Sequence, residues 1–302
     1  VWIFGVLIYL TLMAEAFFGY LLPWGQMSYW GAQVIVNLFA SIPFIGPDLA
    51  LWIRGDYVVG DATLNRFFAM HVIAIPLVLL GLVAAHILAL HDVGSNNPDG
   101  IEIKKKKDAN GHPLDGIPFH PYYTVKDIVG AIVFLAVFCA ILFFVPEVGG
   151  YFLEYNNFIP ADPLKTPTHI APLWYFTPYY SILRAVPPLF TSQFPGVLAM
   201  GIATLILFFL PWLDRSPVKS IRYRGTLYKS ALAIFVVTFV VLGYLGTEPV
   251  TVWGQFGPWL GNADRATVAA RVFTLLYFAF FFLMPWYTAK DKCLPEPDRV
   301  TM

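Results

Sequence analysis

Long apolar runs separated by polar loops organise the whole chain. A helix needs about 20 mainly apolar residues to cross a bilayer, and a scan for such runs predicts six membrane-spanning helices. They lie near 1–22, 64–91, 127–146, 195–214, 228–247 and 269–288. The second run is longer than required, so its helix tilts or projects beyond the hydrocarbon at its C-terminal end. The pattern predicts an all-α polytopic membrane protein.

Two connecting segments, 23–60 and 147–194, are long and rich in Trp, Tyr, Phe and Pro. Aromatic side chains gather at the depth of the lipid headgroups. We therefore expect short amphipathic helices that lie on the outer membrane surface in these two loops. The chain has no internal repeat, which disfavours a transporter built from duplicated halves.

The composition agrees with a protein buried in lipid. Hydrophobic residues make up 58% of the 302 residues and charged residues 13%, whereas a soluble domain carries about 25% charged residues. The 19 basic and 19 acidic residues cancel, so no overall field attracts nucleic acid and we predict no nucleic-acid partner. Cys139 and Cys293 lack the spacing of a disulfide framework or metal site. Val1 lies inside an apolar run without a start methionine, which predicts that the N-terminal part of the protein is missing.

The distribution of Lys and Arg predicts the orientation. Five lie in 92–126, five in 215–229 and three in the C-terminal tail, against six in the loops of the opposite side. Cytoplasmic loops carry the excess, so both ends are expected in the cytoplasm, at a bacterial inner membrane. The run Lys104–Lys107 is interpreted as a solvated segment facing anionic membrane lipid.

The second apolar run contains two histidines, His71 and His86. Ionisable groups at membrane depth are costly and are functional candidates. Fifteen helical residues turn about 60° beyond four full turns, so the imidazoles share a broad face, roughly 22 Å apart. Neutral imidazole is an axial ligand of haem iron, and two such ligands suit two haems stacked across the membrane. The alternative is a pair of core histidines bonded to neighbouring helices.

Several longer motifs carry a resemblance to a known family. ATLNRFFAMH (62–71) and HDVGSNNPDG (91–100) resemble the fourth transmembrane helix of cytochrome b and the turn after it. GYLLPWGQMSYWGAQVI (19–35) resembles the end of the third helix and a surface helix beside the quinol-oxidation site. PFHPYYTVKDIVGA (118–131) resembles the start of the fifth helix, and PLWYFTPYYSILRAVP (172–187) the loop motif of the oxidation site. The chain thus resembles a proteobacterial cytochrome b of the quinol–cytochrome c oxidoreductase, the cytochrome bc1 complex.

The resemblance implies two haem b cofactors. His71 would bind the low-potential haem near the outer face, and His86 the high-potential haem near the inner face. The partner histidines belong to the second helix of the family, upstream of Val1. The separation of His71 and His86 is one residue longer than in mitochondrial relatives.

The resemblance also implies an inner quinone-reduction site made of His91, Ser95, Lys126 and Asp127. A quinone that takes two electrons also needs two protons, and a His and an Asp at the membrane edge can relay them. The alternatives are that Asp127 is a carboxylate favoured by the N-terminal helix dipole and that Lys126 extends to the headgroups.

The outer quinol-oxidation site would use Tyr20, Gly31, Tyr175 and Tyr180. Aromatic residues there are equally typical of an interfacial belt. Gly31 lies among bulky neighbours, which is typical of a place where a ring approaches the backbone closely.

The oxidation-site motif departs from its usual form. The family pattern reads Pro-Glu-Trp-Tyr, with the Glu accepting a quinol proton, and this chain has Leu173 in its place. Leucine cannot accept a proton, so another group must do so. The acids nearest in sequence are Glu147 and Glu154, of which Glu154 is preferred, and the alternative is water with Tyr180. The catalytic candidates are therefore Tyr180, Glu154 and Asp127.

The resemblance implies an electron-transfer subunit with three parts. Residues 1–92 would end the haem-binding bundle, 93–126 form a cytoplasmic loop, and 127–302 form a C-terminal membrane domain with the fifth to eighth helices. Ubiquinol would be oxidised near the outer face, with one electron passing to a Rieske iron–sulfur protein and the other through two b haems to ubiquinone near the inner face. A c-type cytochrome subunit and a second copy of the complex would complete the proton-translocating assembly. A membrane transporter and a haemless membrane anchor are the alternatives.

Overall fold

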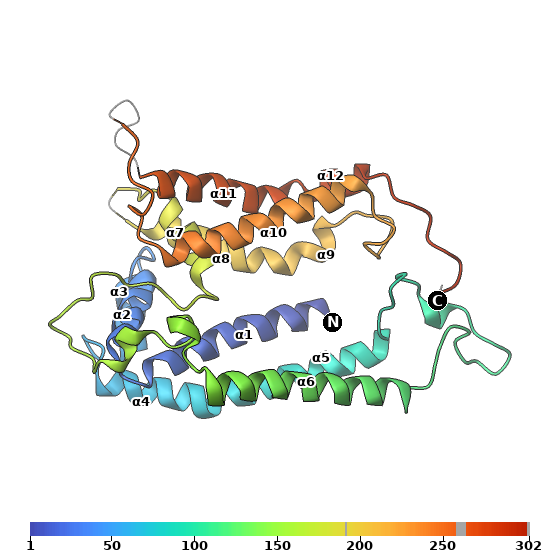
Figure 1. Ribbon diagram of the computed structural model, residues 1–302, viewed down its shortest axis with the longest axis horizontal. Helices are drawn as coiled ribbons and strands as arrows, with labels where there is room; N and C mark the ends of the chain where they lie inside the picture. The colour runs from blue at the N-terminus through green and yellow to red at the C-terminus, as the bar shows by residue number, and fades with distance from the viewer. Residues whose placement is uncertain (191, 258–263, 301–302) are drawn as a thin grey trace.

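The computed structural model describes residues 1–190, 192–257 and 264–300. Helices dominate these parts of the chain (Figure 1). The α-helices are α1 (Trp2–Leu21), α2 (Gln26–Ala40), α3 (Gly46–Arg54), α4 (Asp61–Ala69), α5 (Ile75–Val93), α6 (Tyr122–Phe144), α7 (Thr177–Ala185), α8 (Phe194–Leu205), α9 (Leu210–Leu213), α10 (Thr226–Thr247), α11 (Arg265–Phe282) and α12 (Met284–Lys290). The shorter turns are η1 (Met70–Ala74), η2 (Ile103–Lys105), η3 (Val148–Gly150), η4 (Tyr155–Phe158) and η5 (Ile206–Phe209).

Six helices among the described residues are long and apolar enough to cross a membrane. They are Trp2–Leu21, Asp61–Val93, Tyr122–Phe144, Phe194–Leu213, Thr226–Thr247 and Arg265–Phe282. The six predicted spans are confirmed, because each apolar run forms one helix or one nearly continuous helical segment. The longest joins α4, η1 and α5, and it includes the residues that extend the second run beyond the length of a bilayer crossing.

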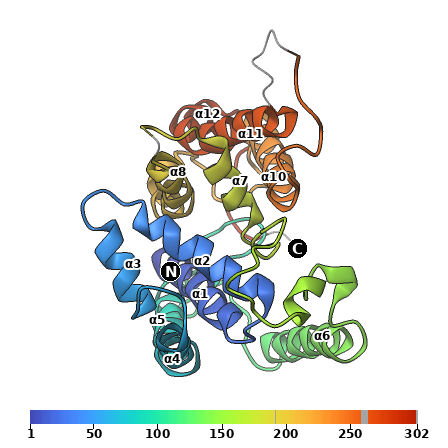
Figure 2. The same cartoon turned by 90° about the vertical axis from the view of Figure 1, so that its left-hand side faces the viewer.

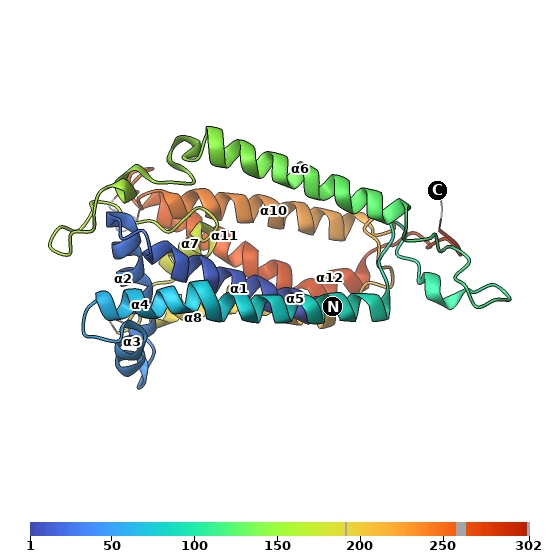
Figure 3. The ribbon, with the colours of Figure 1, turned by 90° about the horizontal axis from the view of Figure 1, so that it is seen from below.

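The spans lie roughly along one direction, with different structures at their two ends. Figures 1 and 3 show α2, α3 and α7 at one end, and the segment between α5 and α6 together with the C-terminus at the other. Seen along the spans in Figure 2, α1, α4 and α5 form one group, while α7, α8, α10, α11 and α12 form a second. Helix α6 has few contacts with either group.

The main core lies in the second group of helices. It is built from Tyr179 and Ile182 of α7, Leu242 of α10, and Tyr277 and Phe281 of α11. The expected short helices of the outer loops are present as α2, α3 and α7. Helix α7 differs from the expectation, because most of its residues are buried against α8, α10 and α11 instead of lying on the surface.

Ion pairs hold the loops together at the end that carries the C-terminus. The buried carboxylate of Asp99 accepts a hydrogen bond from Arg222 Nη1 at 2.7 Å. Glu102 pairs with Lys219, and this contact lowers the pKa of the Glu102 carboxyl. The segment between α5 and α6 is therefore anchored to the loop that precedes α10.

A π turn interrupts the long α4–α5 span at η1, Met70–Ala74. Pro76 follows immediately, in the first turn of α5. Proline has no amide hydrogen, and its ring clashes with the carbonyl four residues earlier, so the regular α-helical ladder cannot continue through this position. The sequence accommodates Pro76 by opening one turn of the helix, and His71 lies within that turn.

Candidate functional site

Two histidines of the α4–η1–α5 span face glycines of α1. A Cβ atom added to Gly5 would lie 3.5 Å from Cε1 of His86, and one added to Gly19 would collide with the imidazole of His71. Each ring therefore occupies a place where α1 carries no side chain. Because α1 and α5 pack against each other, the two imidazoles lie at different depths along one helix pair.

The π turn keeps both rings opposite their glycines. Gly5 and Gly19 are 14 residues apart, whereas His71 and His86 are 15 apart. A π turn contains one residue more than an α turn, so the 15-residue separation spans about as many turns as 14 residues of regular helix. The rings are thus held roughly 21 Å apart along the axis. The extra residue is taken up inside η1.

His71 has a polar partner on α1, Glu15, which the sequence analysis did not select. Its Nδ1 lies 3.0 Å from the backbone oxygen of Glu15 and 3.0 Å from the Glu15 carboxylate oxygen Oε1. An imidazole that donates one ring N–H to a carbonyl or carboxylate presents its other nitrogen to a metal. Among the described residues, no hydrogen bond is made to Nε2 of either His71 or His86, and Nδ1 of His86 is buried without a partner.

His71 and His86 suit an iron whose other ligands are supplied by a cofactor. No group of three or more His, Cys, Asp and Glu residues in the described parts of the chain could hold a metal ion alone. A porphyrin supplies four nitrogens and needs only axial ligands from the protein. His71 and His86 are each suited to provide one such ligand, in positions bordered by glycine.

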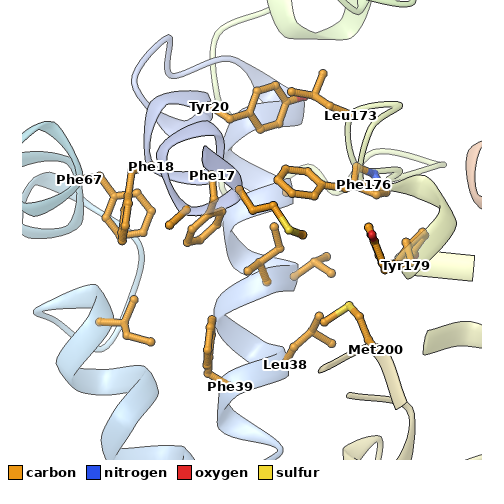
Figure 4. A pocket seen from close by; sticks show the side chains of 18 of the residues that line it. Phe17, Phe18, Tyr20, Leu38, Phe39, Phe67, Leu173, Phe176, Tyr179 and Met200 are labelled. Atoms are coloured by element: carbon orange, nitrogen blue, oxygen red, sulfur yellow. The ribbon is translucent and has the colours of Figure 1, made fainter. Parts of the chain in front are cut away.

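A cavity of about 690 Å³ lies at the end of the bundle that carries α2 and α7 (Figure 4). It is bounded by α1, α2, α8, the end of α4 and the segment that leads into α7. Its walls are mostly aromatic and aliphatic, and include Phe17, Leu38, Phe176, Tyr179 and Met200. A mainly apolar cavity with a few polar groups suits a small, largely apolar ring compound.

Three of the four predicted outer-site residues line this cavity. They are Tyr20, Gly31 and Tyr180. A Cβ atom on Gly31 would lie 3.3 Å from the Tyr20 ring, so this glycine leaves room for that ring. Tyr175 does not line the cavity, and its ring packs between Trp174 and Phe176.

Glu154 lies next to the cavity without lining it. Tyr20 donates a hydrogen bond from its hydroxyl to Oε2 of Glu154. Burial raises the pKa of the Glu154 carboxyl above its usual range. Burial, and to a smaller extent the nearby Glu154 carboxylate, raises the pKa of Tyr175 to about 12. The structure therefore brings Tyr20, Tyr175 and Glu154 together, although α1 and the loop after α6 are far apart in sequence.

Arg184, which the sequence analysis did not assign to the chemistry, positions one wall of the cavity. Its Nη1 donates to the carbonyl of Glu248 at 3.1 Å and its Nη2 to that of Leu245, at the C-terminal end of α10. The guanidinium carbon lies 4.7 Å from the centroid of the Tyr180 ring. Burial lowers the pKa of Arg184.

The four inner-site candidates lie at the opposite end and are all exposed. His91 is near the end of α5, Ser95 is in the loop after it, and Lys126 and Asp127 are in the first turns of α6. Within the described part of the chain, no hydrogen bond or ion pair joins the first two to the last two. The two parts of this predicted site are therefore not bonded directly to each other in the described structure.

Sequence reasoning missed several residues of both sites. Glu15 was the one acid inside the first apolar run, a signal that was available. The 14-residue separation of Gly5 and Gly19, close to that of the histidines, was another. Tyr179 also lines the cavity, and its hydroxyl lies 2.8 Å from that of Tyr9 on α1.

Comparisons with known proteins agree over the whole chain. Residues 1–151 match the family described as "Cytochrome b(N-terminal)/b6/petB", and residues 160–278 match "Cytochrome b(C-terminal)/b6/petD". The cytochrome b of Allochromatium vinosum is 60% identical, covering 99% of this chain and 70% of that protein. The cytochrome b of Rickettsia bellii is 45% identical over 99% of this chain and 68% of its own length.

A solved structure supports the same assignment. A chain of a "Hyperthermophilic respiratory Complex III" superimposes with a TM-score of 0.80 at 39% sequence identity, covering 96% of this chain and 70% of that one. Matches to both halves of one family, together with relatives of high identity, leave one conclusion: the chain belongs to the cytochrome b family.

Proposed function

We propose that this chain is the haem- and quinone-binding cytochrome b subunit of a respiratory quinol–cytochrome c oxidoreductase, and that it acts only within that complex. The observation that carries the proposal is the pair of imidazoles at two depths of one helix pair, each opposite a glycine. Membership of the cytochrome b family and the likeness to a complex III structure support it.

His71 would hold the low-potential haem b near the outer face, and His86 the high-potential haem b near the inner face. When bound, the two haems supply one-electron transfer across the membrane. Glu15 would orient the His71 ring and fix which nitrogen faces the iron. The third histidine of this span, His91, lies near the end of α5, so His71 and His86 are the residues that would hold the two haems.

The cavity beside Tyr20 would bind ubiquinol for oxidation at the outer face. Its apolar walls suit the ring and tail, and its lining residues include two tyrosines, Tyr20 and Tyr180. Gly31 keeps the Tyr20 ring close to α2. Tyr175 would contribute indirectly, because it packs against the cavity residue Phe176 and lies near Glu154.

Quinone reduction would take place near the inner end of α5 and the start of α6. His91, Ser95, Lys126 and Asp127 would bind the ring there, with Asp127 as a proton donor at the membrane edge. Lys104 donates from Nζ to the carbonyl of His91 at 3.2 Å, so the backbone at this end of α5 is tied to the inner loop. Ubiquinone binding would draw the two pairs of residues together.

The proposed setting is a bacterial inner membrane, with both ends of this segment in the cytoplasm. A Rieske iron–sulfur protein would accept one electron from the outer cavity, and a c-type cytochrome would receive it next. A second copy of the complex and membrane lipid would cover apolar helix faces such as that of α6, which is exposed along its whole length.

The test is a potentiometric titration of b-type haem absorbance in membranes that carry the complete complex. Two haem waves are expected in the wild type, with a different one lost in His71→Leu and in His86→Leu. His112→Leu is the matched control, because His112 is an exposed loop histidine, and it should retain both waves. Absence of haem from the wild type, or unchanged spectra in both ligand variants, would refute the proposal and favour a transporter or a haemless anchor.

A further inference from the structure

Oxidation of a quinol releases protons, yet the described residues that line the outer cavity include no Asp or Glu. Leu173 lies on the wall and cannot accept a proton. The lining does include one tyrosine whose hydroxyl is bonded to an acid, because Tyr20 lines the cavity and donates to Glu154. In Figure 4 the side chains of Tyr20 and Leu173 lie at the same end of the cavity.

The position of Glu154 suits a proton acceptor. The residue precedes η4, on the loop that follows α6, and is half-buried. Burial raises the pKa of its carboxyl, so it holds a proton more firmly than an acid in water. It also keeps partial contact with solvent, through which a proton can leave.

Tyr20 is held between the cavity and Glu154, so it can connect them. Its ring lies against Gly31 of α2, where an added Cβ would make a tight contact of 3.3 Å with it. Its hydroxyl hydrogen points to Glu154, which leaves the lone pairs of the oxygen free to accept a hydrogen bond. A tyrosine hydroxyl can accept one proton while it gives up another, so it does not need to become ionised.

We infer that Tyr20 and Glu154 form a proton relay that takes over the task of the acid missing at Leu173. The inference rests on the proposed function of the outer cavity. As an iron–sulfur protein removes one electron from the bound quinol, the O–H bond of the ring breaks and its proton passes to the Tyr20 oxygen. The original Tyr20 proton moves to the Glu154 carboxylate. Tyr20 ends unchanged, and Glu154 carries the proton and releases it to the outer aqueous phase.

The other described acids near this end are less suited. Glu15 lies within α1, and its Oε1 is engaged with His71. Among the described residues, the Glu147 side chain makes no hydrogen bond or ion pair with a cavity residue. Asp162 is exposed and accepts the backbone N–H of Leu164.

Two other titratable side chains also have different roles. His169 is bonded through Nε2 to the carbonyl of Thr247 at 2.9 Å, and does not line the cavity. Tyr180 lines the cavity, but its ring stacks on Arg184 and makes no hydrogen bond to an acid among the described residues. Tyr20 and Tyr175 are the titratable groups that interact with Glu154 itself.

The test compares Glu154→Gln, Tyr20→Phe and the control Glu147→Gln in the complete complex, by measuring quinol:cytochrome c reduction against pH. Loss of a positioned acid–base group costs about 100-fold or more in rate. Glu154→Gln and Tyr20→Phe should each slow quinol oxidation by about that factor. Glu154→Gln should also lose the rise of rate with pH that reports ionisation of the acceptor. The control should match the wild type, and all variants should keep both haem waves.

A double variant tests whether a carboxylate at this end of the cavity is what the reaction needs, and not Glu154 specifically. Adding Leu173→Glu to Glu154→Gln should restore at least a large part of the rate, because it places a carboxylate on the same end of the cavity. The relay is overturned if Glu154→Gln keeps the wild-type rate and pH profile, or if it is slower but keeps the wild-type pH profile. It is also overturned if the double variant does not recover activity. Absence of haem or of quinol oxidation in the wild type would instead refute the proposed function.

Discussion

The contrast between the two glycines of α1 leads to a sharp prediction. Gly19→Ala adds a Cβ that collides with the His71 ring, whereas Gly5→Ala adds one that meets His86 at an ordinary contact distance of 3.5 Å. Both changes improve the intrinsic helix propensity of α1 by about 1 kcal/mol. Their effects on the haems should therefore differ only through the space beside each imidazole.

The cost of Gly19→Ala follows from what His71 must give up. To avoid the new methyl group the ring has to turn, which breaks its contacts with Glu15. A hydrogen bond to a charged group is worth about 1.5–3 kcal/mol, and overpacking adds about 1–3 kcal/mol. With the gain in helix propensity subtracted, a net cost of about 1.5–5 kcal/mol weakens binding of the outer haem roughly 10- to 4,000-fold.

Reduced-minus-oxidised spectra and redox titration of membranes carrying the complete complex measure this effect. Gly19→Ala should lose or displace the low-potential wave and keep the high-potential one, and Gly5→Ala should keep both. Two unperturbed waves in Gly19→Ala would show that His71 does not lie against Gly19 when haem is bound, and the ligand geometry described above would then be wrong.

Three further predictions concern other residues of the two sites. Glu15→Gln removes the carboxylate beside His71 and should raise the midpoint potential of the outer haem alone. The shift is about 59 mV for each tenfold change in the relative affinity of the site for oxidised and reduced haem. An equal shift of both haems in the titration would contradict this. In Arg184→Lys the shorter donor group cannot reach both carbonyls at the end of α10 while it stacks on Tyr180. The variant should destabilise the complex by about 1–2 kcal/mol in thermal unfolding and raise the KM for quinol. An unchanged KM would count against the positioning role of Arg184. Because burial raises the pKa of Glu154, its ionised form destabilises the fold at a pH above that raised value, and the penalty is absent below its unfolded pKa of about 4.3. Glu154→Gln should therefore raise the unfolding temperature near pH 8 and lose that advantage towards pH 4, whereas a pH-independent difference would exclude a raised pKa.

The sequence was sufficient to predict the membrane spans because their apolar runs are long and uninterrupted. The bilayer imposes length and polarity on each helix separately, so no knowledge of neighbouring helices is needed. The outer-loop helices were predicted for a similar local reason. The burial of α7 was not, since it depends on how α8, α10 and α11 meet around it.

The sites were predicted less completely because they are built between helices. The family motifs at 19–35 and 172–187 supplied Tyr20, Gly31 and Tyr180, which line the cavity, and Tyr175, which does not. The hydrogen bond from Tyr20 to Glu154 joins residues 134 positions apart, a relation that no local pattern contains. The partner of His71 was overlooked for the same reason, although Glu15 stood alone among apolar residues.

The π turn at Met70–Ala74 also bears on how relatives of this chain should be aligned. A helix that absorbs one extra residue in a widened turn keeps its two ends in their former orientations, so an insertion there leaves the surfaces on both sides intact. When a cytochrome b with a shorter spacing is aligned to this one, the single-residue gap belongs within these five positions and not in a loop. A gap placed elsewhere would pair His71 or His86 with a residue on the wrong face of the helix.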